Sequence, residues 1–174
     1  NELSVICDKL SIDVWELIRL ANRHPRVKIL QPGPGVGGHC IAVDPWFIVD
    51  AAPAEARLLR AAREVNDSKP HHVVAQVRAA AGQDAAVACL GLAFKANIDD
   101  LRESPLASLA SRLIAKGYDL KIYDPFVQQA YAEGMSGAGR GNDTSIDLKN
   151  RLVGELDDLI DTSDVILVGN HYAE

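Results

Sequence analysis

The sequence of 174 residues is long enough for one ordinary domain or two small ones. Its hydrophobic content of 48% and charged content of 24% are typical of a soluble globular protein. The formal net charge of −6, with Lys and Arg scattered along the chain, argues against a nucleic-acid partner. The apolar runs are too short to cross a bilayer and no signal peptide opens the chain, so we expect no membrane partner.

The cysteines indicate a reducing compartment. They are three in number and widely spaced, which does not suit a disulfide framework, so we expect a cytoplasmic protein. No Cys/His pair has the spacing of zinc ligands, and we expect no metal site. Cys7 and Cys89 each lie in an apolar run and are predicted to be buried and inert.

The segment from Gln31 to Trp46 carries the most distinctive chemistry. Four glycines and two prolines take six of the seven positions 32–38, a composition that excludes a stable helix or central strand. The backbone of such a loop can approach a ligand closely. The loop leads to Cys40, and Asp44 follows four residues later. If Cys40 opens a helical turn, Asp44 lies on the same face and the helix N-terminus favours the thiolate. This pattern indicates an activated nucleophile; the alternative is an inert cysteine after an ordinary turn.

The segment before the glycine loop reads as helical. Residues 3–10 show helical apolar spacing, and Asp13 with Glu16 forms a capping pair for a second helix that ends near Asn22. Because the first helix begins without a cap or an initiator methionine, we expect that an upstream part is missing.

After the loop, Pro53 is predicted in the first turn of a helix that runs to Val65. Residues 66–70 are expected to interrupt it, with Ser68 capping a further helix that ends at Gly82. We therefore predict a helical domain over residues 1–68 and a second domain over residues 69–174.

The second domain alternates strands with helices. Strands are predicted at 85–92, 118–123 and 165–168, helices at 104–116 and 155–161, and a mobile Gly-rich stretch at 134–141. This order predicts an α/β fold in which an all-helical segment precedes a parallel, Rossmann-like sheet. The turn after the first strand has Gly91 but not the Gly-x-Gly-x-x-Gly fingerprint. We therefore expect the strand ends to bind a ligand other than NAD.

Two long motifs resemble one known family. The stretch 35–46, GVGGHCIAVDPW, resembles the nucleophile segment of the UDP-glucose/GDP-mannose dehydrogenase family. The stretch 91–105, GLAFKANIDDLRESP, resembles the opening of that family's C-terminal sugar-nucleotide domain. Together, and in this order, they extend the resemblance over essentially the whole chain. His39 and Ala42 favour the branch that uses UDP-N-acetylmannosamine over the branch that uses UDP-glucose.

The resemblance implies an oxidoreductase that uses two NAD to convert the primary alcohol of a UDP-sugar into the carboxylate. Cys40 would carry a thioester intermediate, and Asp44 would position water or hold a neighbouring base. The NAD-binding domain and further catalytic residues would lie upstream of Asn1. The chain alone is therefore expected to be inactive.

The resemblance also assigns contacts to particular residues. Substrate contacts fall on His24, Arg26, Gly37, Phe94 and Lys95, and a cofactor contact falls on Arg102. His24 and Arg26 would act across a homodimer formed mainly by residues 1–66, near the partner's sugar nucleotide. Without the family resemblance, His24 and Arg26 fit a solvated turn, and Phe94 fits a hydrophobic plug. Lys95 then fits an ordinary solvated lysine, and Arg102 fits a charged surface loop.

Two rival functions stay open at this point. One is a non-catalytic UDP-sugar-binding and dimerisation module. The other is a cysteine hydrolase that uses His39 and Cys40. The hydrolase is the weaker of the two, because adjacent residues rarely place an imidazole on the neighbouring thiol.

Overall fold

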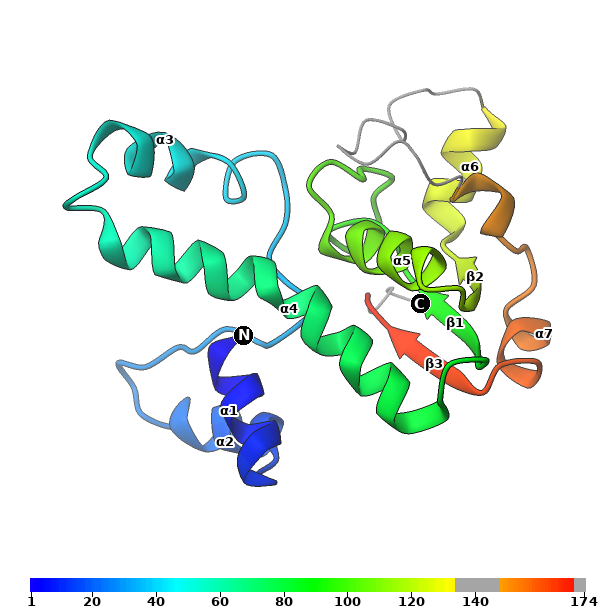
Figure 1. Cartoon of the computed structure of the whole chain (residues 1–174), viewed down its shortest axis with the longest axis horizontal. Helices are drawn as coiled ribbons and strands as arrows, with labels where there is room; N and C mark the ends of the chain where they lie inside the picture. The colour runs from blue at the N-terminus through cyan, green and yellow to red at the C-terminus, as the bar shows by residue number, and fades with distance from the viewer. Residues whose placement is uncertain (134–147, 171–174) are drawn as a thin grey trace.

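The computed structural model describes residues 1–133 and 148–170, so the stretch 134–141 lies outside the described residues. Within them, four helices come first, and a three-stranded sheet with its own helices follows (Figure 1). This arrangement confirms the expected α/β class, in which a helical segment precedes a Rossmann-like parallel sheet. No helix in these two ranges combines the length and the apolar character needed to cross a membrane.

The first two helices, α1 (Glu2–Leu10) and α2 (Val14–Ala21), form where the apolar spacing predicted them. Asp13 caps α2 by accepting hydrogen bonds from the backbone N–H groups of Trp15 (2.8 Å) and Glu16 (3.3 Å). The Glu16 carboxylate pairs with Arg19 at 3.4 Å. Much of the apolar surface of this pair is exposed to solvent, at Leu3, Ile6, Leu10, Ile12, Trp15 and Leu20.

The next two helices, α3 (Asp44–Ala51) and α4 (Arg57–Ala81), correct two predictions. Pro53 does not open a helix, because α4 begins at Arg57. Residues 66–70 do not break α4, although Pro70 lacks the N–H that an unbroken helix would use. The helix persists because it packs against α1, α3 and α5, and this packing outweighs one missing bond. The division of the chain at residue 68 stays a prediction.

The sheet consists of β1 (Ala86–Leu90), β2 (Asp119–Tyr123) and β3 (Val165–Val168), all parallel in the order β2-β1-β3. In the centre, Val87 lies opposite Leu120 and Val165. Three consecutive residues of β1 are fully buried, which explains why the strand reads as a continuous apolar run.

The sheet's helices are α5 (Pro105–Ala115), α6 (Pro125–Ala132) and α7 (Leu156–Asp161), with a 3-10 turn at Lys149–Arg151. Ser104 caps α5 through its hydroxyl, which accepts from Ala107 N–H at 3.3 Å. The sequence analysis did not predict α6. In α6, Asp124 is the cap and Pro125 is the first residue, the pattern of a helix start rather than of a closing turn. The C-terminal half of α4 joins α5 and the sheet in one apolar core.

Candidate functional site

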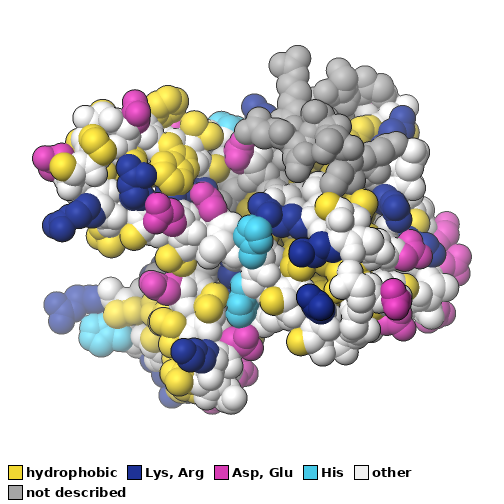
Figure 2. Space-filling model, viewed as in Figure 1, with side chains coloured by type: hydrophobic (Ala, Val, Ile, Leu, Met, Phe, Trp, Pro, Cys, Tyr) yellow, Lys and Arg dark blue, Asp and Glu magenta, His cyan; other side chains and the backbone are white. Residues whose placement is uncertain are grey.

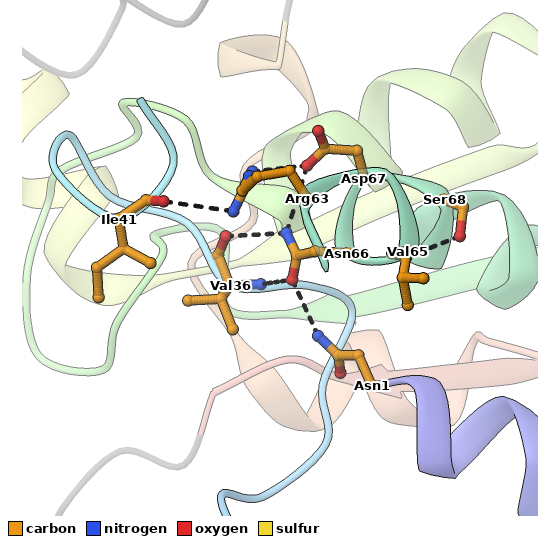
Figure 3. A network of polar contacts seen from close by, with 8 residues as sticks. All are labelled: Asn1, Val36, Ile41, Arg63, Val65, Asn66, Asp67 and Ser68. Atoms are coloured by element: carbon orange, nitrogen blue, oxygen red, sulfur yellow. Dashed lines mark hydrogen bonds and ion pairs between the residues drawn. The ribbon is translucent and has the colours of Figure 1, made fainter. Parts of the chain in front are cut away.

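Helix α4 holds the glycine loop through Asn66, a residue that the sequence analysis placed in a helix break (Figure 3). The Asn66 side-chain oxygen accepts from the Val36 N–H at 2.7 Å, and its amide donates to the Val36 carbonyl at 3.1 Å. Asn1 donates to the same oxygen at 3.0 Å and accepts from Gly33 N–H at 2.9 Å. The side chain of Asn66 thus fixes the loop four residues before Cys40.

Arg63, one turn earlier on α4, holds the chain on the other side of Cys40 (Figure 3). Its side chain is only 10% exposed; it pairs with Asp67 at 2.6 Å and donates to the Ile41 carbonyl at 3.5 Å. Its buried Nε atom has no hydrogen-bond partner among the described residues. The contacts to Val36 and Ile41 bracket Cys40, so one helix positions both ends of the segment that carries the thiol.

The glycines let this loop pack against the second motif. A Cβ atom on Gly37 would collide with the Glu103 carbonyl oxygen and would lie 3.1 Å from Cβ of Phe94. A Cβ atom on Gly38 would lie 3.1 Å from the Phe94 ring. The close approach that the glycines permit is therefore to the loop between β1 and α5. Two motifs that lie more than forty residues apart in the sequence meet in the fold.

Cys40 is exposed, in a turn that leads into α3. The Asp44 N–H donates to the Cys40 carbonyl at 2.8 Å, which is the hydrogen bond of one helical turn, as the spacing suggested. The Cys40 sulfur lies 3.1 Å from Nδ1 of His39. We expected that adjacent residues would rarely place an imidazole on the neighbouring thiol. His39 and Cys40 contradict that expectation, so it no longer argues against a Cys–His pair.

Asp100 and Arg102 form a charged pair beside this turn. The Arg102 guanidinium donates twice to the carboxylate, from Nε at 2.9 Å and from Nη2 at 2.6 Å. These bonds hold the pKa of Asp100 below its ordinary value and raise the pKa of Arg102. His39 also contributes to the low pKa of Asp100, and Cys40 to the raised pKa of Arg102, so the charged pair lies near both residues.

The β1–α5 loop, which packs against the glycine loop, begins at the carboxyl edge of the sheet. This edge does not offer a phosphate site for NAD. In a dinucleotide fold, backbone amides after the first strand bind the pyrophosphate. Here the amides of Leu92 and Ala93 donate to the fully buried Asp124 carboxylate at 2.8 and 3.3 Å. A carboxylate of the chain itself occupies the position that a phosphate would need.

The other residues of this edge are placed as follows. Phe94 is half-buried against Gly38, and Lys95 is exposed. Asn170 follows β3 and donates to the Ala93 carbonyl at 2.9 Å, which ties two strand ends together. Cys89 is fully buried, and burial raises its pKa to about 12, as expected for an inert thiol.

His24 and Arg26 lie apart from Cys40 within one chain. Both are exposed in the turn after α2, where Arg26 N–H donates to Nδ1 of His24 at 3.3 Å. In Figure 1, α1 and α2 lie on one side of α4, and α3 and α5 lie on the other. A role for these two residues at the Cys40 site would therefore require a second copy of the chain.

The sequence analysis missed three residues that build the site: Arg63, Asn66 and Asp124. Asp124-Pro125 carries a helix-start signal that could have been read. Asn66 and Arg63 carry no local signal for this role, because the loop residues that they hold, Val36 and Ile41, lie more than twenty residues away. Among residues 1–133 and 148–170, no group of three or more His, Cys, Asp or Glu side chains is placed to hold a metal ion.

Substituting Asn66 by Ala is expected to lower the free energy of unfolding by about 1–3 kcal/mol, because three hydrogen bonds to a half-buried amide are lost. The freed loop should also change the rate at which iodoacetamide alkylates Cys40, by about twofold or more. Urea unfolding and alkylation kinetics measure the two effects.

Asn22 provides a matched control, because its side-chain amide forms the same two kinds of hydrogen bond with the backbone. It donates to the Ile29 carbonyl at 3.0 Å and accepts from the Ile29 N–H at 2.7 Å. Asn22→Ala should cost similar stability and leave the alkylation of Cys40 unchanged. Equal alkylation rates in the parent and in Asn66→Ala would contradict the positioning role of Asn66.

Comparison with known proteins matches both halves of the chain to one family. The model of the UDP-glucose/GDP-mannose dehydrogenase family, central domain, matches residues 1–68, and that of the family's UDP binding domain matches residues 88–174. An NDP-N-acetyl-D-galactosaminuronic acid dehydrogenase of Ralstonia nicotianae is 66% identical over 116 residues, which are 66% of this chain and 27% of that protein.

A UDP-N-acetyl-D-mannosamine dehydrogenase of Escherichia coli is 59% identical over 141 residues, which are 74% of this chain and 33% of that protein. The solved structure of a UDP-N-acetyl-mannosamine dehydrogenase of Staphylococcus aureus superimposes with a TM-score of 0.74 at 34% identity, over 98% of this chain and 37% of that one. The chain thus spans about a quarter to a third of the length of the curated relatives it matches.

Proposed function

Because the chain belongs to the UDP-glucose/GDP-mannose dehydrogenase family, we propose that it supplies the nucleophile and the sugar-nucleotide site of an NAD-dependent dehydrogenase. The substrate of the proposed reaction is UDP-N-acetylmannosamine, whose primary alcohol is oxidised in two steps to the carboxylate. The observation that supports the proposal most directly is the packing of the Cys40 loop against the loop that follows β1. Parallel α/β sheets bind ligands at this edge.

Cys40 and Asp44 perform the chemistry of the second oxidation in this proposal. The Cys40 thiolate attacks the aldehyde carbon and forms a thiohemiacetal. After oxidation of that carbon, Cys40 holds it as a thioester, and water positioned by Asp44 releases the carboxylate and the free thiol. The exposure of Cys40 and the helical turn that joins it to Asp44 support these roles.

NAD supplies the hydride acceptor of the proposed reaction. Because the Asp124 carboxylate accepts hydrogen bonds from the backbone amides after β1, the sheet of this chain does not fit NAD. We therefore place the main cofactor site outside these 174 residues. Arg102 is the residue of this chain that we propose to reach toward the cofactor. We propose cytoplasm as the compartment, since an exposed free thiol needs a reducing environment.

The sugar nucleotide is proposed to lie at the carboxyl edge of the sheet. Phe94 would contact the base or the sugar, Lys95 would pair with a phosphate, and the backbone at Gly37 would border the sugar. The half-buried ring of Phe94, the free position of the Lys95 ammonium at the strand ends and the approach of the glycine loop support this placement.

Calorimetry on this chain tests the placement. UDP and UDP-N-acetylmannosamine are expected to bind, and NAD to bind much more weakly. Lys95→Gln should weaken UDP binding about fivefold, because one ion pair with a phosphate is lost. Lys116→Gln, at the opposite edge of the sheet, is the matched control and should leave binding unchanged. Tighter binding of NAD than of UDP would overturn the assignment of the sheet.

A non-catalytic UDP-sugar-binding and dimerisation module is the second candidate. The backbone amides of Leu92 and Ala93 already donate to Asp124, so the usual NAD phosphate site after β1 is absent. This favours the non-catalytic module for the chain taken alone. The two candidates separate when the chain is extended at its N-terminus by the NAD-binding domain that the family resemblance implies. NADH formation with UDP-N-acetylmannosamine supports the dehydrogenase, and its absence in the folded, UDP-binding extended protein supports the module.

We also propose a two-fold homodimer. Figure 2 shows apolar side chains gathered over α3 and over the α1–α2 pair, and exposed apolar surface of this extent marks interfaces. Light scattering at micromolar concentration is expected to give about twice the 18.7 kDa mass of one chain. Trp15→Glu, which places a charge on the 55%-exposed Trp15 position, should shift the population to monomer. A parent chain that is monomeric would contradict the dimer and the action of Arg26 across it.

A further inference from the structure

The contact between His39 and Cys40 carries an inference beyond the roles given above. We propose that His39 is a second catalytic residue, whose Nδ1 atom accepts the proton of the Cys40 thiol. The S–H bond breaks and an N–H bond forms when the sulfur attacks, so His39 acts as the general base of the nucleophile. This inference rests on the proposed function in one respect, namely that Cys40 is the nucleophile.

The geometry suits proton transfer. The sulfur and Nδ1 are 3.1 Å apart, within hydrogen-bond reach, and both residues are exposed, so solvent and substrate can reach the pair. The backbone on either side is held by long-range contacts, since Val36 is bound to Asn66 and Ile41 to Arg63. The pair therefore sits in a turn that the fold positions, rather than in a free loop.

The neighbouring charges are ordered to favour the charged form of the pair. The positive Arg102 interacts with Cys40, and the negative Asp100 interacts with His39. The Asp100–Arg102 hydrogen bonds fix this order, at 2.6 to 3.1 Å. A thiolate beside a guanidinium and an imidazolium beside a carboxylate place opposite charges next to each other in both cases.

Other titratable or charged groups border the turn from three elements. They are Asp44 of α3, Arg63 with Asp67 of α4, and Lys95 and Glu103 of the loop before α5. Their formal charges nearly cancel. The order of charges next to the sulfur and the imidazole, rather than an excess of one sign, is therefore what favours the ion pair.

Alkylation of this chain by iodoacetamide tests the inference without any dehydrogenase assay. Only the thiolate reacts, and Cys7 and Cys89 are buried, so the rate reports on Cys40. His39→Asn puts an amide near the position of Nδ1 but cannot take up the proton. The alkylation rate at pH 7 should fall about fivefold, the size expected for one lost ion pair. His71→Asn, an exposed histidine of α4, is the matched control and should react like the parent.

A second measurement uses the unsubstituted chain, in case the substitution disturbs the turn. Diethyl pyrocarbonate carbethoxylates exposed imidazoles, so the treated chain should be alkylated at Cys40 about fivefold more slowly. Hydroxylamine removes the carbethoxy group and should restore the rate. Unchanged alkylation in folded His39→Asn, or in the carbethoxylated chain, would overturn the proposal. Neither result depends on the proposed oxidation, so failure of this inference and failure of the proposed function can be told apart.

Discussion

Replacing Cys40 by Ser in the protein extended by the proposed NAD-binding domain is expected to abolish carboxylate formation, with a loss on the order of 10³-fold or more. The hydroxyl of Ser is a far weaker nucleophile than a thiolate at neutral pH, and it does not form the thioester that the proposed second oxidation requires. The affinity for the UDP-sugar should change little, because the proposed phosphate and base contacts lie at the sheet. Product analysis by mass spectrometry and calorimetry measure the two effects.

The control for this change is Cys7→Ser, on α1, where the side chain is buried outside the site. That variant should keep its turnover if it stays folded. Near-normal carboxylate formation by Cys40→Ser would remove Cys40 as the nucleophile. That result would not contradict the proposed sugar-nucleotide site, because the residues that support it lie at the carboxyl edge of the sheet.

Replacing Gly37 by Ala is expected to lower the free energy of unfolding by about 1–3 kcal/mol, the usual cost of overpacking. The new methyl group would collide with the Glu103 carbonyl oxygen and with Cδ of Pro105, at 2.6 Å. Both obstacles are held in place by the start of α5, so neither can move aside cheaply. The loop that carries Cys40 should therefore lift off the second motif, and UDP-sugar turnover by the protein extended with the proposed NAD-binding domain should fall.

Gly33→Ala is the matched control in the same loop, since the nearest atom to a Cβ there is 3.9 Å away. Its unfolding free energy should stay within about 0.5 kcal/mol of the parent, as for ordinary surface changes. Urea unfolding of the two variants measures the contrast. Equal stability of Gly37→Ala and Gly33→Ala would contradict the packing of the loop against the β1–α5 segment.

Local signals in the sequence predicted much of the fold. Asp13 and Ser104 cap helices where their side chains suggested, because a cap needs only the next few residues. The strand in the apolar run 85–92 forms within it as β1, because burial on both faces demands a continuous apolar run. The strand at Val165–Val168 also forms as predicted, although Ile166 and Val168 are exposed. These features depend on near neighbours in the chain.

Features that depend on distant residues were out of reach. Pro70 reads as a helix breaker, yet α4 continues because its flanks are packed against α1 and α5. Gly37 reads as a place where a ligand approaches, whereas in the fold Glu103 and Phe94 approach it. Such partners follow from tertiary contacts alone, and no pattern of composition or spacing announces them.

The Cys40 loop and the carboxyl edge of the sheet are proposed to form one site. Protection of Cys40 from iodoacetamide in this 174-residue chain tests it most directly, with calorimetry used to choose saturating ligand concentrations. Saturating UDP-N-acetylmannosamine should slow the alkylation of Cys40 several-fold, UDP should slow it less, and NAD should have no effect. An alkylation rate that is the same with and without saturating UDP-N-acetylmannosamine would contradict the claim, because the bound sugar would then lie away from the thiol.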